Sequence, residues 1–325
     1  MSGFSWNLIG DLRAQLFWEF MRNAYAAGTI IAVVAGVVSY LVVLRRSSFA
    51  AHALGHVGFS GAAGAVLFAV NPLYGLLLAT TVSGTGIAIL GKRAAHRDVE
   101  IGTVLAFMLG LGLLFISFYR GFASEAYSIL FGEIVGVSNS QVMFTLEVSL
   151  AVLIGLALVY RPIMFASLDE DVAEAKGMPT LLLGVIFMLA LAVAVSIAVT
   201  VIGVLLIFAL TVTPAAIAIR LARRPMYAVL ISVLVAVGAT WGGIFIGYYA
   251  TPEPTSFFIV TIVFAVYVVV RAAPLVRSTF AWRFRRLQPA PTAAFDASAH
   301  STPTTLGESS PLPPARPDQT IGMSR

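Results

Sequence analysis

Nine apolar runs, each long enough to cross roughly 30 Å of hydrocarbon as a helix, limit what this chain can fold into. They fall at residues 23–44, 49–70, 73–90, 99–118, 141–160, 180–199, 201–219, 226–249 and 256–273. Backbone groups in lipid need hydrogen-bond partners within the chain, so each run is expected to be a helix. We therefore predict an all-α, polytopic membrane bundle of about eight or nine transmembrane helices. The stretch 180–219 fits either two spans joined by a tight turn near Thr200 or one broken helix.

Composition supports lipid as the solvent and narrows the chemistry. Charged residues make up 11% of the chain, against roughly 25% in soluble domains. The absence of cysteine excludes disulfides, iron–sulfur clusters and thiolate metal sites, so any metal must bind through nitrogen or oxygen. The net charge is +5, but the basic residues lie in short loops between apolar runs, which argues against nucleic acid as a partner.

The basic residues also predict the orientation of the chain in the membrane. Alternate loops carry most of them, and the positive-inside rule makes these loops cytoplasmic: Arg45 and Arg46; Lys92, Arg93 and Arg97; Arg161 and Lys176; Arg220, Arg223 and Arg224; Arg271 and Arg277. The N-terminus is then outside and the C-terminus cytoplasmic. We expect three parts: an N-terminal segment 1–16, a transmembrane domain 17–275, and a tail 276–325. The tail begins with basic and aromatic residues, which either contact anionic membrane lipids or form a positive stop after the last span. It continues as a disordered Pro/Ser/Thr-rich segment, residues 288–325.

The motif HALGH, residues 52–56, places two histidines four apart inside an apolar run. This spacing puts both imidazoles on one helix face. A zinc protease of this spacing needs glutamate directly after the first histidine, and Ala53 stands there, so hydrolysis by that mechanism is excluded. Two readings stay open: His52 and His56 are transient metal ligands on a transport path, or they are packed against neighbouring helices. Glu147, the carboxylate well inside a predicted span, is either a second stop on that path or a hydrogen-bonded group of the bundle.

No credible nucleotide site is present in the sequence. GIAILGKR, residues 86–93, fits the glycine-rich phosphate-loop spacing but ends in Arg93, where a serine or threonine must hold magnesium. The segment also follows a predicted membrane helix rather than a strand. Any energy from ATP must therefore come from a separate subunit, and we expect a transport subunit rather than an enzyme.

Five blocks, in order along the chain, resemble the integral-membrane permeases of bacterial ABC-type manganese/zinc importers, over about residues 17–275. They are the opening helix with its double-basic turn and histidine-containing second helix (17–65), HRDVEIGTVLAFMLGLGLLFIS (96–117), LFGEIVGVS (130–138), FASLDEDVAEAKGMP (165–179) and VIGVLLIFALTVTPAAIAIRLARR (201–224). The resemblance implies a multi-pass protein of the bacterial plasma membrane. It also implies a permease dimer, cytoplasmic ATPase subunits and an extracytoplasmic metal-binding protein. No tightly bound cofactor is implied; Zn²⁺ or Mn²⁺ is the cargo.

Residue roles follow from the resemblance. In the family, an acidic residue or histidine and a second histidine four positions later accompany metal passage, and these positions match His52 and His56. Two nitrogen ligands favour zinc over manganese, which prefers oxygen. The segment 165–177 resembles the part that docks on the ATPase, or else it is a solvated acidic loop. Its residues of interest are Phe165, Asp169, Glu170, Glu174, Ala175 and Gly177. Independently of the resemblance, Pro214 is expected to bend its helix, and the bend is either a hinge or static packing.

Three other classes of function compete with this interpretation. A permease for another cargo, such as an iron–siderophore complex, needs a wider cavity and no histidine pair. A membrane enzyme needs a catalytic constellation, and the four histidines of the chain do not form one with neighbouring acids or nucleophiles in the sequence. A passive channel needs no docking segment.

Overall fold

The structure is a computed structural model that describes residues 8–90, 97–118, 132, 134–250 and 254–285. The chain divides into two units, Met1–Arg277 and Ser278–Arg325. Residues 278–285 of the second unit are described and form the end of a helix, whereas the predicted disordered tail from residue 288 lies outside the described residues. All packing discussed below belongs to the first unit.

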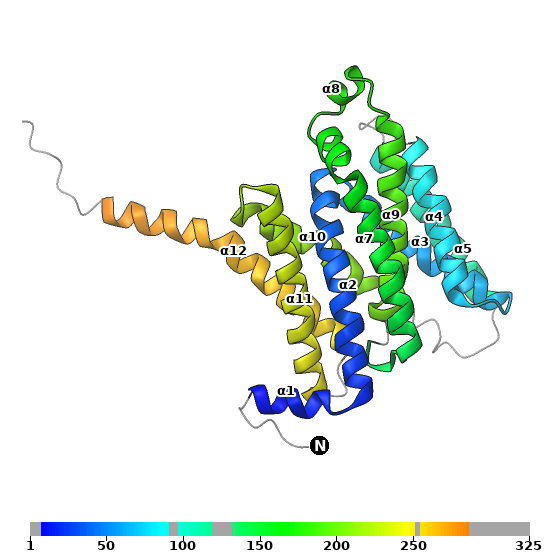
Figure 1. Ribbon diagram of the computed structural model, residues 1–325, viewed down its shortest axis with the longest axis horizontal. Coiled ribbons are helices and arrows are strands. Elements are labelled where there is room, and N and C mark those ends of the chain that lie inside the picture. The colour runs from blue at the N-terminus through cyan, green and yellow to red at the C-terminus, as the bar shows by residue number, and fades with distance from the viewer. Residues whose placement is uncertain (1–7, 91–96, 119–131, 133, 251–253, 286–325) are drawn as a thin grey trace, which may run out of the picture. The chain divides into compact units, whose positions relative to one another are not determined.

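Every described regular element is helical, which confirms the predicted all-α class (Figure 1). The elements are α1 (Leu8–Leu16), α2 (Glu19–Leu44), α3 (Ser48–Leu67), α4 (Pro72–Leu90), α5 (Arg97–Phe118), η1 (Ile134–Gly136), α7 (Asn139–Leu168), α8 (Glu170–Ala175), α9 (Thr180–Ile202), α10 (Val204–Leu221), α11 (Pro225–Tyr249) and α12 (Thr255–Arg285). Each of the nine apolar runs therefore contributes one long helix. The last of these helices continues to residue 285, past the predicted end at 273.

Seven helices among the described residues are long and apolar enough to cross a membrane. These are α2, α4, α5, α7, α9, α11 and α12. The other two runs form α3, which is rich in glycine, alanine, serine and histidine, and α10, whose apolar part is shorter. Of the predicted eight or nine spans, seven therefore meet the criteria of length and composition among the described residues, and α3 and α10 do not.

Two helices organise the packing. α2 packs against α7, α9, α10 and α11, while α3 packs against α4, α5, α9 and α10. Because α3 has helical neighbours on several sides, it does not need the apolar surface that a lipid-facing helix requires. This explains why the run with the histidine pair, which is not among the seven candidate spans, can form an internal helix.

The contact between α3 and α4 depends on two glycines that face each other. A Cβ atom on Gly61 would collide with the carbonyl oxygen of Gly75, and a Cβ on Gly75 would collide with the carbonyl oxygen of Gly61. Helices in lipid gain little from the hydrophobic effect on association, so close backbone approach between small residues supplies van der Waals attraction instead.

Hydroxyl side chains hold the other helices together. Thr80 of α4 and Ser196 of α9 share a buried hydrogen bond of 2.6 Å. Ser232 of α11 donates to the carbonyl oxygen of Gly36 in α2 at 2.8 Å. Interhelical bonds of this kind are each worth roughly 0.6–2 kcal/mol in a membrane protein.

The break within residues 180–219 falls at Gly203, three residues after the predicted turn near Thr200. Gly203 has φ +82° and ψ +164°, a backbone conformation that side chains with a Cβ rarely adopt. The residue ends α9 and caps the start of α10. The stretch therefore forms two helices separated by one residue.

We predict that Gly61→Ala destabilises the protein, because the added methyl group forces α3 and α4 apart. Overpacking of this kind costs about 1–3 kcal/mol. The check is thermal unfolding of the purified chain in detergent, followed by far-UV circular dichroism. Gly86→Ala is the matched control, since a Cβ at Gly86 of α4 meets nothing within 4 Å. Equal midpoints for the two variants would contradict the proposed contact.

Candidate metal-pathway and docking sites

The two histidines of HALGH lie one turn apart on α3 and their rings touch. The ring centroids of His52 and His56 are 4.7 Å apart, with the ring planes at 82°. The ring of His52 also lies 4.7 Å from the ring of Phe208, which belongs to α10. Both histidines are half-buried. The structure therefore brings the predicted pair together and adds an aromatic neighbour from a distant part of the chain.

The position of the pair on α3 follows from its neighbours on the helix. Gly55 lies beside Val204 and Ile207 of α10. On another side of α3, the Ser60 hydroxyl donates to the carbonyl oxygen of Met108 in α5. At 100° per residue, His52 and His56 fall between these two directions, so their face of α3 lies between α10 and α5.

No third ligand completes a metal site within the described residues. Groups of three or more histidine, cysteine, aspartate or glutamate side chains able to hold a metal do not occur there. Glu147 belongs to α7, which packs chiefly on α2 and α9, and its side chain is exposed in the single chain. The buried side of α7 instead carries Val142, Thr145, Ser149, Val152 and Leu156. A role for Glu147 on the metal path stays a prediction.

Pro214 is buried within α10, and the helix continues through it. A proline frees backbone groups of the preceding turn, and neighbouring helices must satisfy them. The backbone N–H of Ala215 donates to the Ser39 hydroxyl of α2 at 3.1 Å. Sequence reasoning did not find Ser39, because nothing in its neighbourhood marks it as the partner of a residue 176 positions away.

The predicted docking segment forms the end of α7 and the short helix α8. Asp169 ends α7 and begins α8, and its carboxylate accepts a hydrogen bond from the Val172 N–H at 3.0 Å. The Lys176 ammonium lies 4.8 Å from the ring centroid of Phe165. Four acidic side chains of the segment are exposed: Asp169, Glu170, Asp171 and Glu174.

The far end of α8 is closed by a Schellman motif. The Met178 N–H bonds to the Ala173 carbonyl at 3.1 Å, and the Gly177 N–H bonds to the Glu174 carbonyl at 2.8 Å. Gly177 has φ +76°, the left-handed conformation that this motif requires. Ala173 is fully buried, so α8 is anchored on the bundle by one face and presents Glu174 and Ala175 on the other.

Comparison with known proteins identifies relatives over most of the chain. The manganese import system permease protein ScaB of Streptococcus gordonii is 28% identical over 232 residues, which are 71% of this chain and 83% of the relative. The manganese transport system membrane protein MntC of Halalkalibacterium halodurans is 25% identical over 210 residues, which are 64% of this chain and 72% of the relative.

A solved structure shares the fold. PsaBC from Streptococcus pneumoniae, determined in complex with a Fab, includes a chain with a TM-score of 0.72 and 24% sequence identity. The match covers 81% of this chain and 95% of that one. The helical arrangement described above is thus found in a known protein.

A family model matches residues 17–273, which include every site residue discussed here. The chain therefore belongs to the ABC 3 transport family, whose members are multi-pass membrane permease subunits rather than enzymes.

Proposed function

We propose that the chain is the membrane permease of an ATP-driven importer for a divalent transition-metal ion. The observation that carries this proposal is the contact between His52 and His56 on one half-buried face of α3. Imidazole is a common metal ligand. Ionisable groups within a membrane helix cost solvation free energy, so their presence indicates a function. Family membership and the names of the two relatives support the same cargo class.

The relatives and the histidine pair favour different metals. The relatives ScaB and MntC carry names of manganese systems. The two imidazole nitrogens, by contrast, favour zinc over manganese, which prefers oxygen ligands. We propose Mn²⁺ or Zn²⁺ as the cargo, with manganese as the first metal to test. Within the described residues a single chain supplies only two side-chain ligands, too few to hold an ion tightly.

A second copy of the chain would complete the coordination. The histidine face between α10 and α5 is only partly covered in the single chain. A permease dimer that joins these faces across a two-fold axis would bring two pairs of imidazoles together, enough for four-coordinate contact with one ion. An extracytoplasmic metal-binding protein delivers the ion to this path. Pro214 lies on the same helix as Phe208, so a hinge there would move the aromatic wall beside His52.

Cytoplasmic ATPase subunits would dock on residues 165–177. The support is local: α8 is anchored through buried Ala173 and exposes an acidic face, as a surface for a basic partner would. In this proposal all nine long helices cross the bilayer, with the N-terminus outside. The basic residues of the α2–α3 and α10–α11 connections and α8 then share the cytoplasmic side.

We predict that His56→Ala lowers metal uptake by about tenfold at limiting metal. Loss of one imidazole ligand weakens the binding free energy of the metal by about 1.4 kcal/mol, which corresponds to a factor of ten. Uptake of radioactive manganese and zinc would be measured in cells that lack other importers. The result also separates the two metals, since only the true cargo is affected.

Phe208→Leu is the control for ring packing, because it removes the aromatic contact with His52 but no ligand. We expect this variant to retain most of the uptake. Undiminished uptake of both metals by His56→Ala would remove the ligand role of the pair.

We further predict that Glu174→Lys and Gly177→Ala each weaken co-purification with the ATPase subunit. The first reverses an exposed charge, and the second forces a Cβ into the left-handed conformation at φ +76° and distorts the end of α8. Co-purification and metal-coupled ATP hydrolysis are the measurements.

Asp98→Lys provides a matched charge reversal, since Asp98 is an exposed acid at the start of α5 and lies outside the docking segment. Association should survive in this control. Should both segment variants also keep full association and coupled hydrolysis, residues 165–177 would not be the docking surface.

A further inference from the structure

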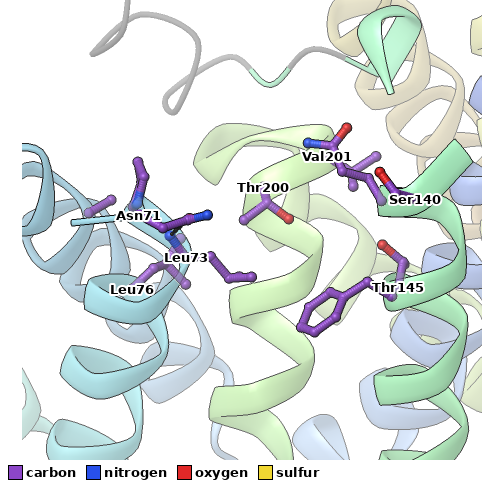
Figure 2. Close-up of a pocket in the computed structure, with 11 residues that line it drawn as sticks. Asn71, Leu73, Leu76, Ser140, Thr145, Thr200 and Val201 are labelled. Carbon is purple, nitrogen blue, oxygen red and sulfur yellow. Dashed lines mark hydrogen bonds between the residues drawn. The ribbon is translucent and has the colours of Figure 1, made fainter. Parts of the chain in front are cut away.

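A cavity of about 410 Å³ lies between α4, α7 and α9, apart from the histidine pair (Figure 2). It occupies the end of the bundle where α4 and α7 begin and where α9 ends. Its lining combines neutral polar and apolar side chains: Ala62, Asn71, Pro72, Leu73, Leu76, Ser140, Gln141, Phe144, Thr145, Thr200 and Val201. Its volume falls within the range of small-molecule sites.

The amide oxygens of Asn71 and Gln141 are engaged in hydrogen bonds, which leaves their NH₂ groups as the available donors. The Asn71 Oδ1 atom accepts a hydrogen bond from the Leu73 N–H at 3.0 Å, in the first turn of α4. The Gln141 Oε1 atom accepts from the Ser138 N–H at 2.9 Å, as part of the capping box of α7. These bonds fix which end of each amide is oxygen. Both amides therefore have donor groups left for a ligand.

Thr145 adds a hydroxyl group to the cavity lining. Its side chain is 2% exposed, and no hydrogen bond joins its hydroxyl to another residue in the described part of the chain. Figure 2 shows this hydroxyl directed from α7 toward the space beside α9. The Thr145 oxygen is not one of the fully enclosed, unpaired side-chain atoms of the described residues, so it is accessible from the cavity and free to pair with a ligand there.

The charge at the cavity indicates which class of ligand it binds. α4 and α7 both begin at this cavity, and helix N-termini carry partial positive charge. With amide donors at the same two termini, the site favours a group with acceptor oxygens and negative charge. The same features disfavour a divalent cation. The cavity is therefore not a stop on the proposed metal path.

The apolar part of the lining favours an oxyanion that carries apolar groups over a free inorganic anion. Leu73, Leu76 and Phe144 line the cavity together with the donors. Beyond it, α4 and α7 expose large apolar side chains toward the surrounding medium, among them Leu78 and Met143. A ligand that fits this site has a polar group at the N-termini of α4 and α7 and apolar groups that lie along the two helices.

We propose that this cavity binds the phosphate headgroup of a membrane phospholipid, whose acyl chains lie along α4 and α7. The phosphate oxygens accept hydrogen bonds from Asn71 Nδ2, Gln141 Nε2 and the Thr145 hydroxyl. The lipid fills the space between the two helices and braces both against α9.

The test uses a double variant that keeps both helix caps. Asn71→Asp with Gln141→Glu retains the two oxygens that accept from the Leu73 and Ser138 N–H groups, but replaces both NH₂ donors by negative charge. Lipid binding would be measured by native mass spectrometry of the purified full chain, titrated with phosphatidylglycerol in detergent. We expect one specific lipid on the unmodified chain and at least about tenfold weaker binding by the variant, because two donors become repulsive charges.

Asn139→Asp is the control for charge at the N-terminus of α7, since it adds one negative charge there but outside the cavity. It should bind lipid as the unmodified chain does. Thr145→Val, which keeps the side-chain shape, should weaken binding several-fold. Circular dichroism establishes that each variant is folded.

Three results would overturn the proposal. One is equal lipid binding by the double variant and the unmodified chain. Another is displacement of the lipid by millimolar inorganic phosphate, which would assign the cavity to a free anion. The last is unchanged lipid binding together with lost association of the metal-binding protein, which would assign the donors to a carboxylate of that partner. None of these results depends on which metal is carried.

Discussion

Close packing between helices, without help from the hydrophobic effect, is the constraint on which this structure depends. Lipid is as apolar as leucine, so two membrane helices associate only where their surfaces fit closely or exchange hydrogen bonds. The chain meets this requirement with glycine against glycine at Gly61 and Gly75, and with hydroxyl bridges such as Thr80–Ser196. The result is an internal helix, α3, that is shielded from lipid on several sides by α4, α5, α9 and α10.

Shielding of α3 is also what permits the histidine pair. Imidazoles facing hydrocarbon would carry a large solvation cost, whereas a face between two other helices can be lined by protein or water. The neighbours of the pair are fixed by contacts on either side, Gly55 with α10 and Ser60 with α5. The small residues that let the helices approach thus also determine which face of α3 stays only partly covered.

Apolar run length was enough to predict the helices, because each of the nine runs became one long helix. Spacing was likewise enough to place His52 beside His56, since residues four apart share a helix face. The orientation of Glu147 could not be obtained in this way. Both the lipid-facing and the protein-facing sides of α7 are apolar, so the pattern that reveals the buried side of a soluble helix is absent. Phe208, Ser39 and the cavity residues depend on contacts between distant segments, for which a single sequence carries no signal.

The aspartate shared by α7 and α8 has a mechanical consequence. Because Asp169 is at once the last cap of one helix and the first cap of the next, α8 cannot shift without carrying the end of α7 with it. α7 has 30 residues and is about 45 Å long, so a tilt of roughly 5° displaces its opposite end by about 4 Å. That opposite end holds Ser140, Gln141 and Thr145. A partner that binds α8 in the proposed complex would therefore also move the cavity at the opposite end of α7.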